Sequence, residues 1–282
     1  MIKIFPFIFI ILWSSAFIII KFFIVYCYSF AALAFLFFFV AVGFLLFSIY
    51  SNYSIIIKRK NLIESVLSGV LFHGLYLGGV FYSISIGMPT SIAALIVTLQ
   101  PILTNILSGP ILNEKVTFKQ WIGVLLGFLG ATLVLGLDLG SKIPLLGLVA
   151  TIIALISITA STIWQKKLSY NLPLSVSNFY QAVGGCFFHI LVVIFFAKPY
   201  IAFTKTFFLA MGHQILLVSF GAFTILMFLI KKNSASKTVS IFFLIPATSA
   251  LMAWFFLGET LTVTDLLGFL ITSIGVYIAT RD

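Results

Sequence analysis

The sequence predicts an all-α integral membrane protein with ten transmembrane helices, arranged as two inverted five-helix repeats. Of its 282 residues, 62% are hydrophobic and only 8% are charged, whereas a soluble globular chain carries about 25% charged residues. Apolar runs long enough to cross a hydrocarbon core, which takes about 20 residues, recur along the whole chain. Finally, the first half aligns with the second at a constant offset of 145 residues.

The expected helices are charge-poor runs separated by short polar loops, and no long polar block leaves room for a separate soluble domain. The first turn is the least marked, because no charged residue occurs between Lys21 and Lys58, and we place it at residues 26–29. The expected spans are residues 4–20, 30–50, 65–86, 90–113, 119–137, 144–165, 175–197, 207–230, 235–257 and 262–280.

The first apolar run also resembles a signal peptide, because Lys3 precedes an apolar core that is followed by small residues. We expect it to be retained as the first helix, since residues 13–21 belong to the internal repeat.

Basic residues indicate the orientation. We expect the protein in the inner membrane of the cell, with both termini in the cytoplasm. In that orientation twelve Lys and Arg residues fall in inner loops and four in outer loops. This split follows the positive-inside rule. The inner set is Lys3, Lys58, Arg59, Lys60, Lys115, Lys119, Lys166, Lys167, Lys231, Lys232, Lys237 and Arg281; the outer set is Lys21, Lys142, Lys198 and Lys205. These short basic loops favour contact with anionic membrane lipids and no nucleic acid.

The repeat covers residues 1–140 and 141–282, which form one membrane domain. Because each copy holds five helices, an odd number, the second copy enters the membrane from the opposite face. Such inverted repeats support alternating access to a central site. The residues that keep their spacing are Pro101, Glu114, Gly123 and Gly130, which align with Pro246, Glu259, Gly268 and Gly275.

Three segments resemble the drug/metabolite transporter superfamily, in its ten-helix EamA-like branch. They are WSSAFIIIK at 13–21, SIAALIVTLQPILTNILSGPILNEKVTFKQWIGVLLGFLGATLV at 91–134, and SKTVSIFFLIPATSALMAWFFLGETLTVTDLLGFLITSIGVYIA at 236–279. The resemblance implies a secondary transporter of small organic metabolites, such as amino acids or related zwitterions. A lipid or drug exporter or flippase of the same fold is the alternative.

Polar and aromatic side chains near the middle of the membrane are the candidates for a substrate cavity, because a desolvated solute needs hydrogen bonds and stacking faces. Each of them could instead make an interhelical hydrogen bond. The candidates are Trp13, Ser14, Ser15, His73, Tyr76, Gln100, Asn105, Asn178, Tyr180 and Gln181.

Two prolines and two glutamates occur at matching positions of the repeats. Pro101 and Pro246 each remove a backbone donor inside an expected span and so predict a kink beside the transport path. Glu114 and Glu259 precede helices that we expect to begin at Thr117 and Thr262, where the helix dipole favours negative charge. We expect a structural role for both glutamates and leave an ion-coupling role as the alternative.

No carboxylate lies deep in an expected span, which weakens the case for strong ion coupling. His73 is the remaining titratable candidate, although a buried core histidine is the simpler interpretation. Neither paired carboxylates, a His-rich motif nor a glycine-rich phosphate loop supports the rival class, a membrane enzyme. We expect no cofactor and no metal. Cys27 and Cys186 share no motif spacing, and the protein is expected to work as a monomer or homodimer.

Overall fold

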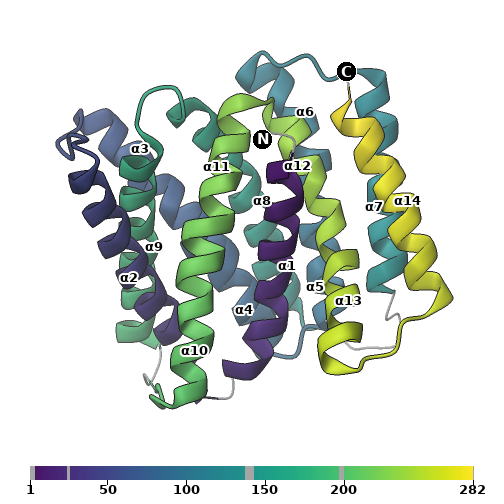
Figure 1. Ribbon diagram of the computed structural model, residues 1–282, viewed down its shortest axis with the longest axis horizontal. Helices are drawn as coiled ribbons and strands as arrows, with labels where there is room; N and C mark the ends of the chain where they lie inside the picture. The colour runs from purple at the N-terminus through teal and green to yellow at the C-terminus, as the bar shows by residue number, and fades with distance from the viewer. Residues whose placement is uncertain (1–3, 24–25, 137–142, 197–199, 282) are drawn as a thin grey trace.

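The computed structural model describes residues 4–23, 26–136, 143–196 and 200–281, and these residues form a bundle of helices (Figure 1). Nine helical segments of this part are long and apolar enough to cross a membrane, and the N-terminal helix α1 (Phe5–Phe23) is a further apolar helix. The predicted helical membrane class is therefore confirmed, and the expected count of ten is reached when α1 is included. Both ends of the chain lie at the same end of the bundle (Figure 1), called the terminal end below.

The first repeat contains five spans, two of which change their helical geometry on the way through. The third span passes through a π-helical segment, and the fourth is broken near its middle. Its elements are α1, α2 (Ser29–Tyr50), α3 (Arg59–Gly69), η3 (Val70–Tyr76), α4 (Leu77–Ser85), α5 (Thr90–Val97), α6 (Gln100–Leu112) and α7 (Phe118–Leu135).

The second repeat has the same sequence of elements, except that it adds a 3₁₀ turn, η5, in its fourth span. At an offset of 145 residues the start of α2 falls on the start of α9, and the π-helical segment η3 falls within η4. Local irregularities thus recur as well as spans. The elements are α8 (Leu145–Leu168), α9 (Leu174–Phe196), α10 (Lys205–His213), η4 (Gln214–Ala222), α11 (Phe223–Lys232), α12 (Ala235–Ser240), η5 (Ile241–Phe243), α13 (Leu244–Leu257) and α14 (Val263–Thr280).

Thr117 and Thr262 begin the last helix of each repeat, as predicted. Each threonine oxygen accepts a hydrogen bond from the backbone N–H three residues on, and the side chains of Gln120 and Asp265 bond back to the threonine N–H groups. These reciprocal bonds satisfy two donors that an open helix end leaves exposed. The residue three positions after the threonine differs between the repeats, Gln120 in one and Asp265 in the other, but the capping geometry is the same.

The third span starts earlier than predicted, at Arg59 rather than at residue 65. The hydrophobicity pattern misses this first turn and a half because it contains Arg59, Lys60 and Glu64. The helix continues through them because their side chains sit outside the apolar zone, where a helix tolerates charge.

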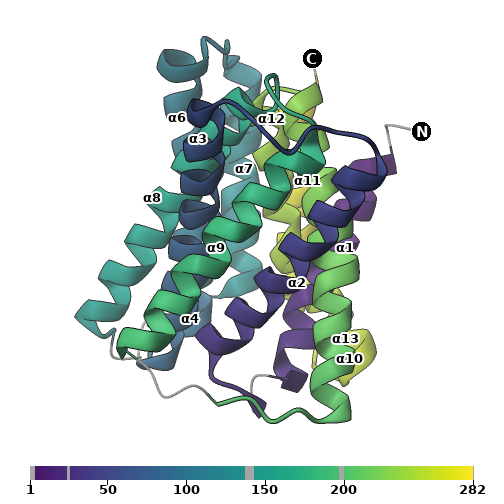
Figure 2. The same ribbon diagram turned by 90° about the vertical axis from the view of Figure 1, so that its left-hand side faces the viewer.

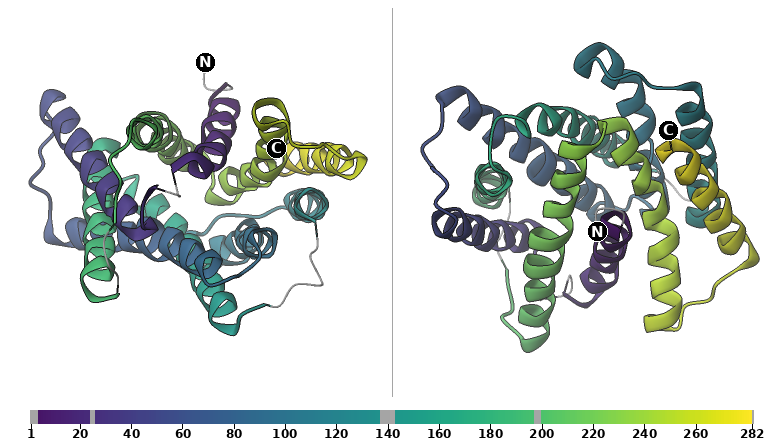
Figure 3. Two further views of the ribbon diagram at one scale, coloured as in Figure 1. Left: turned by 90° about the horizontal axis from the view of Figure 1, so that it is seen from below. Right: turned by 45° about the horizontal axis from the view of Figure 1, so that its top comes forward.

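Helices α2 and α9 pack side by side and slant across one face of the bundle (Figure 2). Helix α1 lies between α11 and α13, and it contacts both (Figure 3). The buried cluster that includes Phe9, Phe72, Phe223 and Phe243 joins residues of the two repeats. A first-repeat helix is therefore embedded among second-repeat helices, so the two repeats share one core.

Candidate functional site

Trp13 occupies the middle of α1 and is enclosed by aromatic side chains from both repeats. Its ring centroid lies 5.3 Å from that of Phe9, 6.2 Å from that of Phe72 and 6.0 Å from that of Phe242. Phe242 stacks on it with an interplanar angle of 26°. Trp13 is nevertheless only partly buried, so part of a large aromatic face stays accessible halfway along a span.

The two serines after Trp13 tie α1 to the second repeat. The Ser14 hydroxyl, 0% exposed, donates to the carbonyl of Ile245 at 3.3 Å, and the Ser249 hydroxyl donates to the Ser14 carbonyl at 3.4 Å. The Ser15 hydroxyl lies 3.1 Å from Nε2 of His213. Ser14 is therefore a packing residue, whereas the Ser15–His213 pair is partly exposed and can exchange hydrogen bonds with a solute.

His73 and Tyr76 lie in η3 and are buried. The His73 ring packs 4.4 Å from the ring of Phe37, and Nε2 of His189 lies 2.8 Å from the His73 carbonyl oxygen. Tyr76 packs against Phe72 at 5.5 Å. These contacts place His73 in an aromatic core between α2 and α9, as its simpler interpretation predicts, while Tyr76 reaches the Trp13 cluster through Phe72.

Gln100 and Asn105 make interhelical hydrogen bonds. The Gln100 amide donates to the hydroxyl of Thr162 at 3.0 Å, which links α6 to α8. The Asn105 side-chain oxygen accepts from the Ser236 hydroxyl and links α6 to α12. Both side chains are buried, and both join the first repeat to the second.

The three candidates on α9 differ from one another. The Tyr180 hydroxyl donates to the Ile55 carbonyl at 2.8 Å, in the loop after α2 at the terminal end. The Gln181 side-chain oxygen accepts from Gln165 of α8 at 2.9 Å. Asn178 is 1% exposed, and neither atom of its amide has a hydrogen-bond partner among the described residues. The ten candidates therefore do not form one cluster, because Tyr180 and Asn105 bond to groups at the terminal end.

Each proline lies where the α-helix in the fourth span of its repeat is interrupted. Pro101 is the second residue of α6, directly after the break at Thr98 and Leu99. Pro246 is the third residue of α13 and follows the 3₁₀ turn η5. The missing proline N–H groups explain the interruption at matching positions.

Sequence reasoning passed over Phe72, His213 and Phe242, which complete the surroundings of Trp13 and Ser15. A polar pair, His213 and Gln214, inside an expected span was the available indication. The Gln214 amide donates to the Ala16 carbonyl at 3.2 Å, so the π-helical segment η4 is held against α1.

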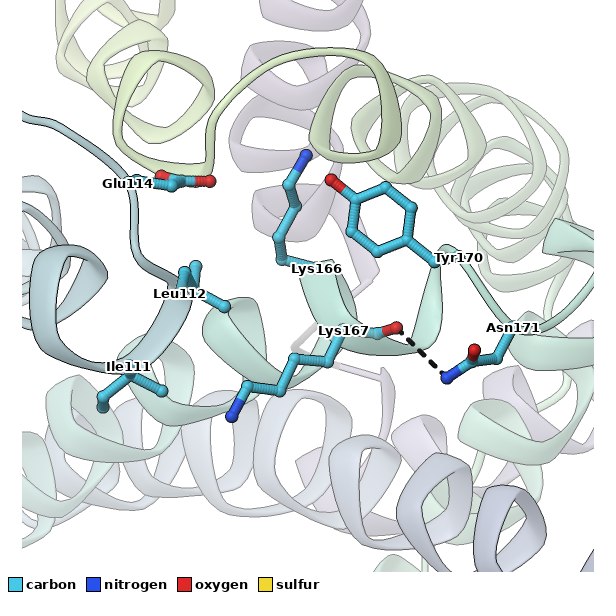
Figure 4. Close-up of a pocket in the computed structure, with 7 residues that line it drawn as sticks. All are labelled: Ile111, Leu112, Glu114, Lys166, Lys167, Tyr170 and Asn171. Atoms are coloured by element: carbon cyan, nitrogen blue, oxygen red, sulfur yellow. Dashed lines mark hydrogen bonds between the residues drawn. The ribbon is translucent and has the colours of Figure 1, made fainter.

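Two cavities open at the terminal end of the bundle. The larger, about 610 Å³, is lined by residues of the loop before α3, the first turns of α3 and the α8–α9 loop, among them Lys58, Lys60 and Glu64. The smaller, about 330 Å³, contains Glu114 and Lys166 (Figure 4). Its lining residues are Ile111, Leu112, Glu114, Lys166, Lys167, Tyr170 and Asn171.

Glu114 caps a helix N-terminus, as its residue type predicts, but the helix is not the one that follows it in sequence. Its carboxylate accepts from the backbone N–H groups of Ala235 at 2.9 Å and Ser236 at 3.5 Å, at the start of α12. Glu259, its counterpart, is exposed. The first repeat thus provides the capping group for a helix of the second.

These features define the class: a multi-pass helical membrane protein whose two repeats share a core and meet around α1. The model of the EamA-like transporter family matches residues 2–136 and again residues 145–281. The chain belongs to this family and is a membrane transporter.

Named relatives agree with that assignment. The chain is 27% identical over 221 residues to the uncharacterized transporter YvbV of Bacillus subtilis, covering 74% of this chain and 68% of that protein. It is 23% identical over 242 residues to an uncharacterized transporter of Archaeoglobus fulgidus, covering 80% of each. One crystal structure superposes with a TM-score of 0.84 over 99% of this chain and 97% of its own, at 16% identity, which shows the shared fold.

Proposed function

We propose that the protein is a secondary transporter, without ATP hydrolysis or enzymatic activity, that moves amino acids or related zwitterionic metabolites by alternating access. It works in the inner membrane with both termini in the cytoplasm. The twelve-to-four division of basic residues supports this orientation, and the position of both chain ends at one end of the bundle agrees with it (Figure 1).

One observation carries the substrate proposal: Trp13 is partly exposed in the middle of a span, so its aromatic face can stack on an apolar part of a small solute. Ser15 of α1 and His213 of α10 form a separate, partly exposed polar pair. This pair lies on another side of α1, because residues two apart in a helix do not face each other.

Charge supports a zwitterion or neutral solute over an inorganic ion. In the described part of the chain the acidic residues are Glu64, Glu114, Glu259 and Asp265, and all four lie at helix ends or in hairpins. A transporter that binds sodium ions or relays protons usually places a carboxylate within the membrane. We therefore propose transport down the solute gradient, without strong ion coupling.

Thermal stabilisation of the purified protein by a panel of amino acids, nucleosides and phospholipids tests the substrate class, because a ligand of the folded state raises its apparent stability. Each hit is then measured by counterflow in proteoliposomes, with and without a pH gradient. Saturable exchange that ignores the pH gradient supports the proposal. A pH-driven acceleration lost in His73→Ala contradicts uncoupled transport, and lipid scrambling without solute exchange contradicts the substrate class.

A further inference from the structure

The turn between α11 and α12, residues 233–234, is held by a buried lysine from the end of α8. The ammonium of Lys166 donates to the carbonyls of Ile230 at 2.7 Å and Asn233 at 2.5 Å, and the side chain is only 7% exposed. Ile230 lies in the last turn of α11 and Asn233 is its C-cap residue, at the helix end that carries partial negative charge. Lys166 therefore caps the C-terminus of α11.

The other side of the same turn is held by Glu114, which comes from the first repeat. Its carboxylate caps the N-terminus of α12 through Ala235 and Ser236, where a helix carries partial positive charge. The Ser236 hydroxyl also bonds to Asn105. Figure 4 shows the Glu114 carboxylate and the Lys166 amine both directed toward the light-green ribbon of this turn. Each charge meets the helix end of opposite sign.

The opposite end of the bundle is arranged differently. At the terminal end α6 packs against α12, which joins the two repeats. The offset of 145 residues converts this pair into α13 and α5, and within the described part of the chain that pair forms no comparable interface. Thr90, the counterpart of Ala235, and Glu259, the counterpart of Glu114, are exposed. The repeats still meet at that end, because the Tyr28 N–H donates to the Tyr200 carbonyl at 2.8 Å and α4 packs against α8. What that end lacks, among the described residues, is a counterpart of the α6–α12 contact.

We propose that Lys166 and Glu114 form a latch that keeps the terminal end closed by holding the α11–α12 turn against α6 and α8. The proposal rests on the alternating access proposed above. Breaking the cap bonds frees the α11–α12 turn from α6 and α8, so the terminal end opens. Transport then requires that this latch releases when the terminal end opens.

Distances between spin labels test the latch without any substrate. Labels at Lys119→Cys and Lys232→Cys report on the terminal end, and labels at Ser85→Cys and Thr264→Cys report on the other, in protein whose Cys27 and Cys186 are replaced by Ala. Lys166→Met should raise the ratio of open to closed terminal ends about tenfold, because charged hydrogen bonds are worth at least that factor. Glu114→Gln should shift it in the same direction by about threefold, since an amide still accepts but lacks the charge.

Two matched controls keep the result specific. Lys167→Met removes the adjacent, exposed lysine of the same cavity, and Glu259→Gln makes the Glu114 change at the mirror position; neither should open the terminal end. The double variant Lys166→Met/Glu259→Gln should give the same ratio as Lys166→Met, because Glu259 is exposed at the opposite end of the bundle.

The latch itself is overturned when Lys166→Met and Glu114→Gln both give wild-type distances, or when Lys167→Met opens the end equally. Should Lys166→Met fail to fold, Glu114→Gln and Lys166→Arg decide: the glutamine must open the end, and the arginine, which keeps the charge, must open it less. Because no solute is present, a failed latch leaves the transport proposal standing, and a failed ligand search leaves the latch standing.

Discussion

Gly123 of α7 and Gly275 of α14 pack backbone against backbone. A Cβ atom on Gly123 would lie 2.5 Å from the Gly275 carbonyl oxygen, and a Cβ atom on Gly275 would lie 2.7 Å from the Gly123 carbonyl oxygen. Gly130 and Gly268 repeat the relationship at 2.6 and 2.7 Å. The offset of 145 residues equates Gly123 with Gly268 and Gly130 with Gly275, so each glycine meets the partner that a two-fold axis between the repeats requires.

Gly123→Ala should therefore destabilise the protein by about 1–3 kcal/mol, because the new methyl group has no space between the two backbones. The measurement is the melting temperature of the purified protein in detergent. Gly212→Ala is the matched control, since a Cβ atom on Gly212 meets nothing within 4 Å and alanine favours a helix by up to about 1 kcal/mol. Equal melting temperatures for both variants would contradict the close packing.

Trp13→Ala should abolish the ligand-induced rise in melting temperature, because it removes the accessible aromatic face in the middle of α1. Phe9→Ala is the control: Phe9 belongs to the same cluster but is 0% exposed, so its loss creates a cavity and lowers stability by about 3 kcal/mol or more. The ligand-induced rise should survive in Phe9→Ala. A rise that persists unchanged in Trp13→Ala would remove Trp13 from the binding site.

Asn178→Leu should raise the melting temperature, since the native amide is buried without a partner among the described residues and such a group costs about 1–3 kcal/mol. Gln181→Leu, one turn further along α9, should lower it, because it breaks the bonds that Gln181 makes with Gln165 and Ser177. Thermal melts of both variants in the same detergent give the comparison. Destabilisation by Asn178→Leu would show that the amide has a partner, such as ordered water.

Cys27 should react slowly with maleimides at neutral pH. It lies in the turn between α1 and α2, and burial raises the pKa of its thiol to about 11. Only the thiolate is the nucleophile, so about one thiol in a thousand is reactive at pH 8, and the rate should rise about tenfold per pH unit below pH 11. Mass spectrometry follows the adduct, with Ser54→Cys in an exposed loop as the control. Labelling of Cys27 as fast as the control at pH 8 would contradict the burial.

Much of the fold was predictable because its determinants are local. The apolar runs locate the spans, and Thr117 and Thr262 mark helix starts because a short side chain can bond the next turn. The first turn of α3 was missed because Arg59 and Lys60 lie in a helix outside the apolar zone. The π-helical segments η3 and η4 were missed too, since they depend on how the third span of each repeat packs against its neighbouring helices.

The candidate site was predictable only in part. Trp13 and Ser15 were found because polar and aromatic side chains are conspicuous in an apolar span. Tyr180 was placed with them by depth alone, although its hydroxyl bonds to Ile55 at the terminal end. Glu114 was assigned to the helix that follows it, although its carboxylate caps α12. Depth along a helix can be read from sequence, but the direction of a side chain around the helix axis depends on its neighbours.

By itself, the sequence determined that the chain crosses a membrane, that two copies of a five-helix unit face opposite ways, and which family it resembles. Hydropathy, basic loops and a constant offset suffice for these properties because they depend on residues close in the chain or on a fixed spacing. Only the tertiary structure decided that Lys166 and Glu114 meet one turn, and that, in the part of the chain that it describes, α6 packs against α12 at the terminal end while α13 and α5 form no comparable interface at the other. Such contacts join residues more than sixty positions apart, and two nearly equivalent repeats can make them at either end, so the sequence alone is compatible with both arrangements.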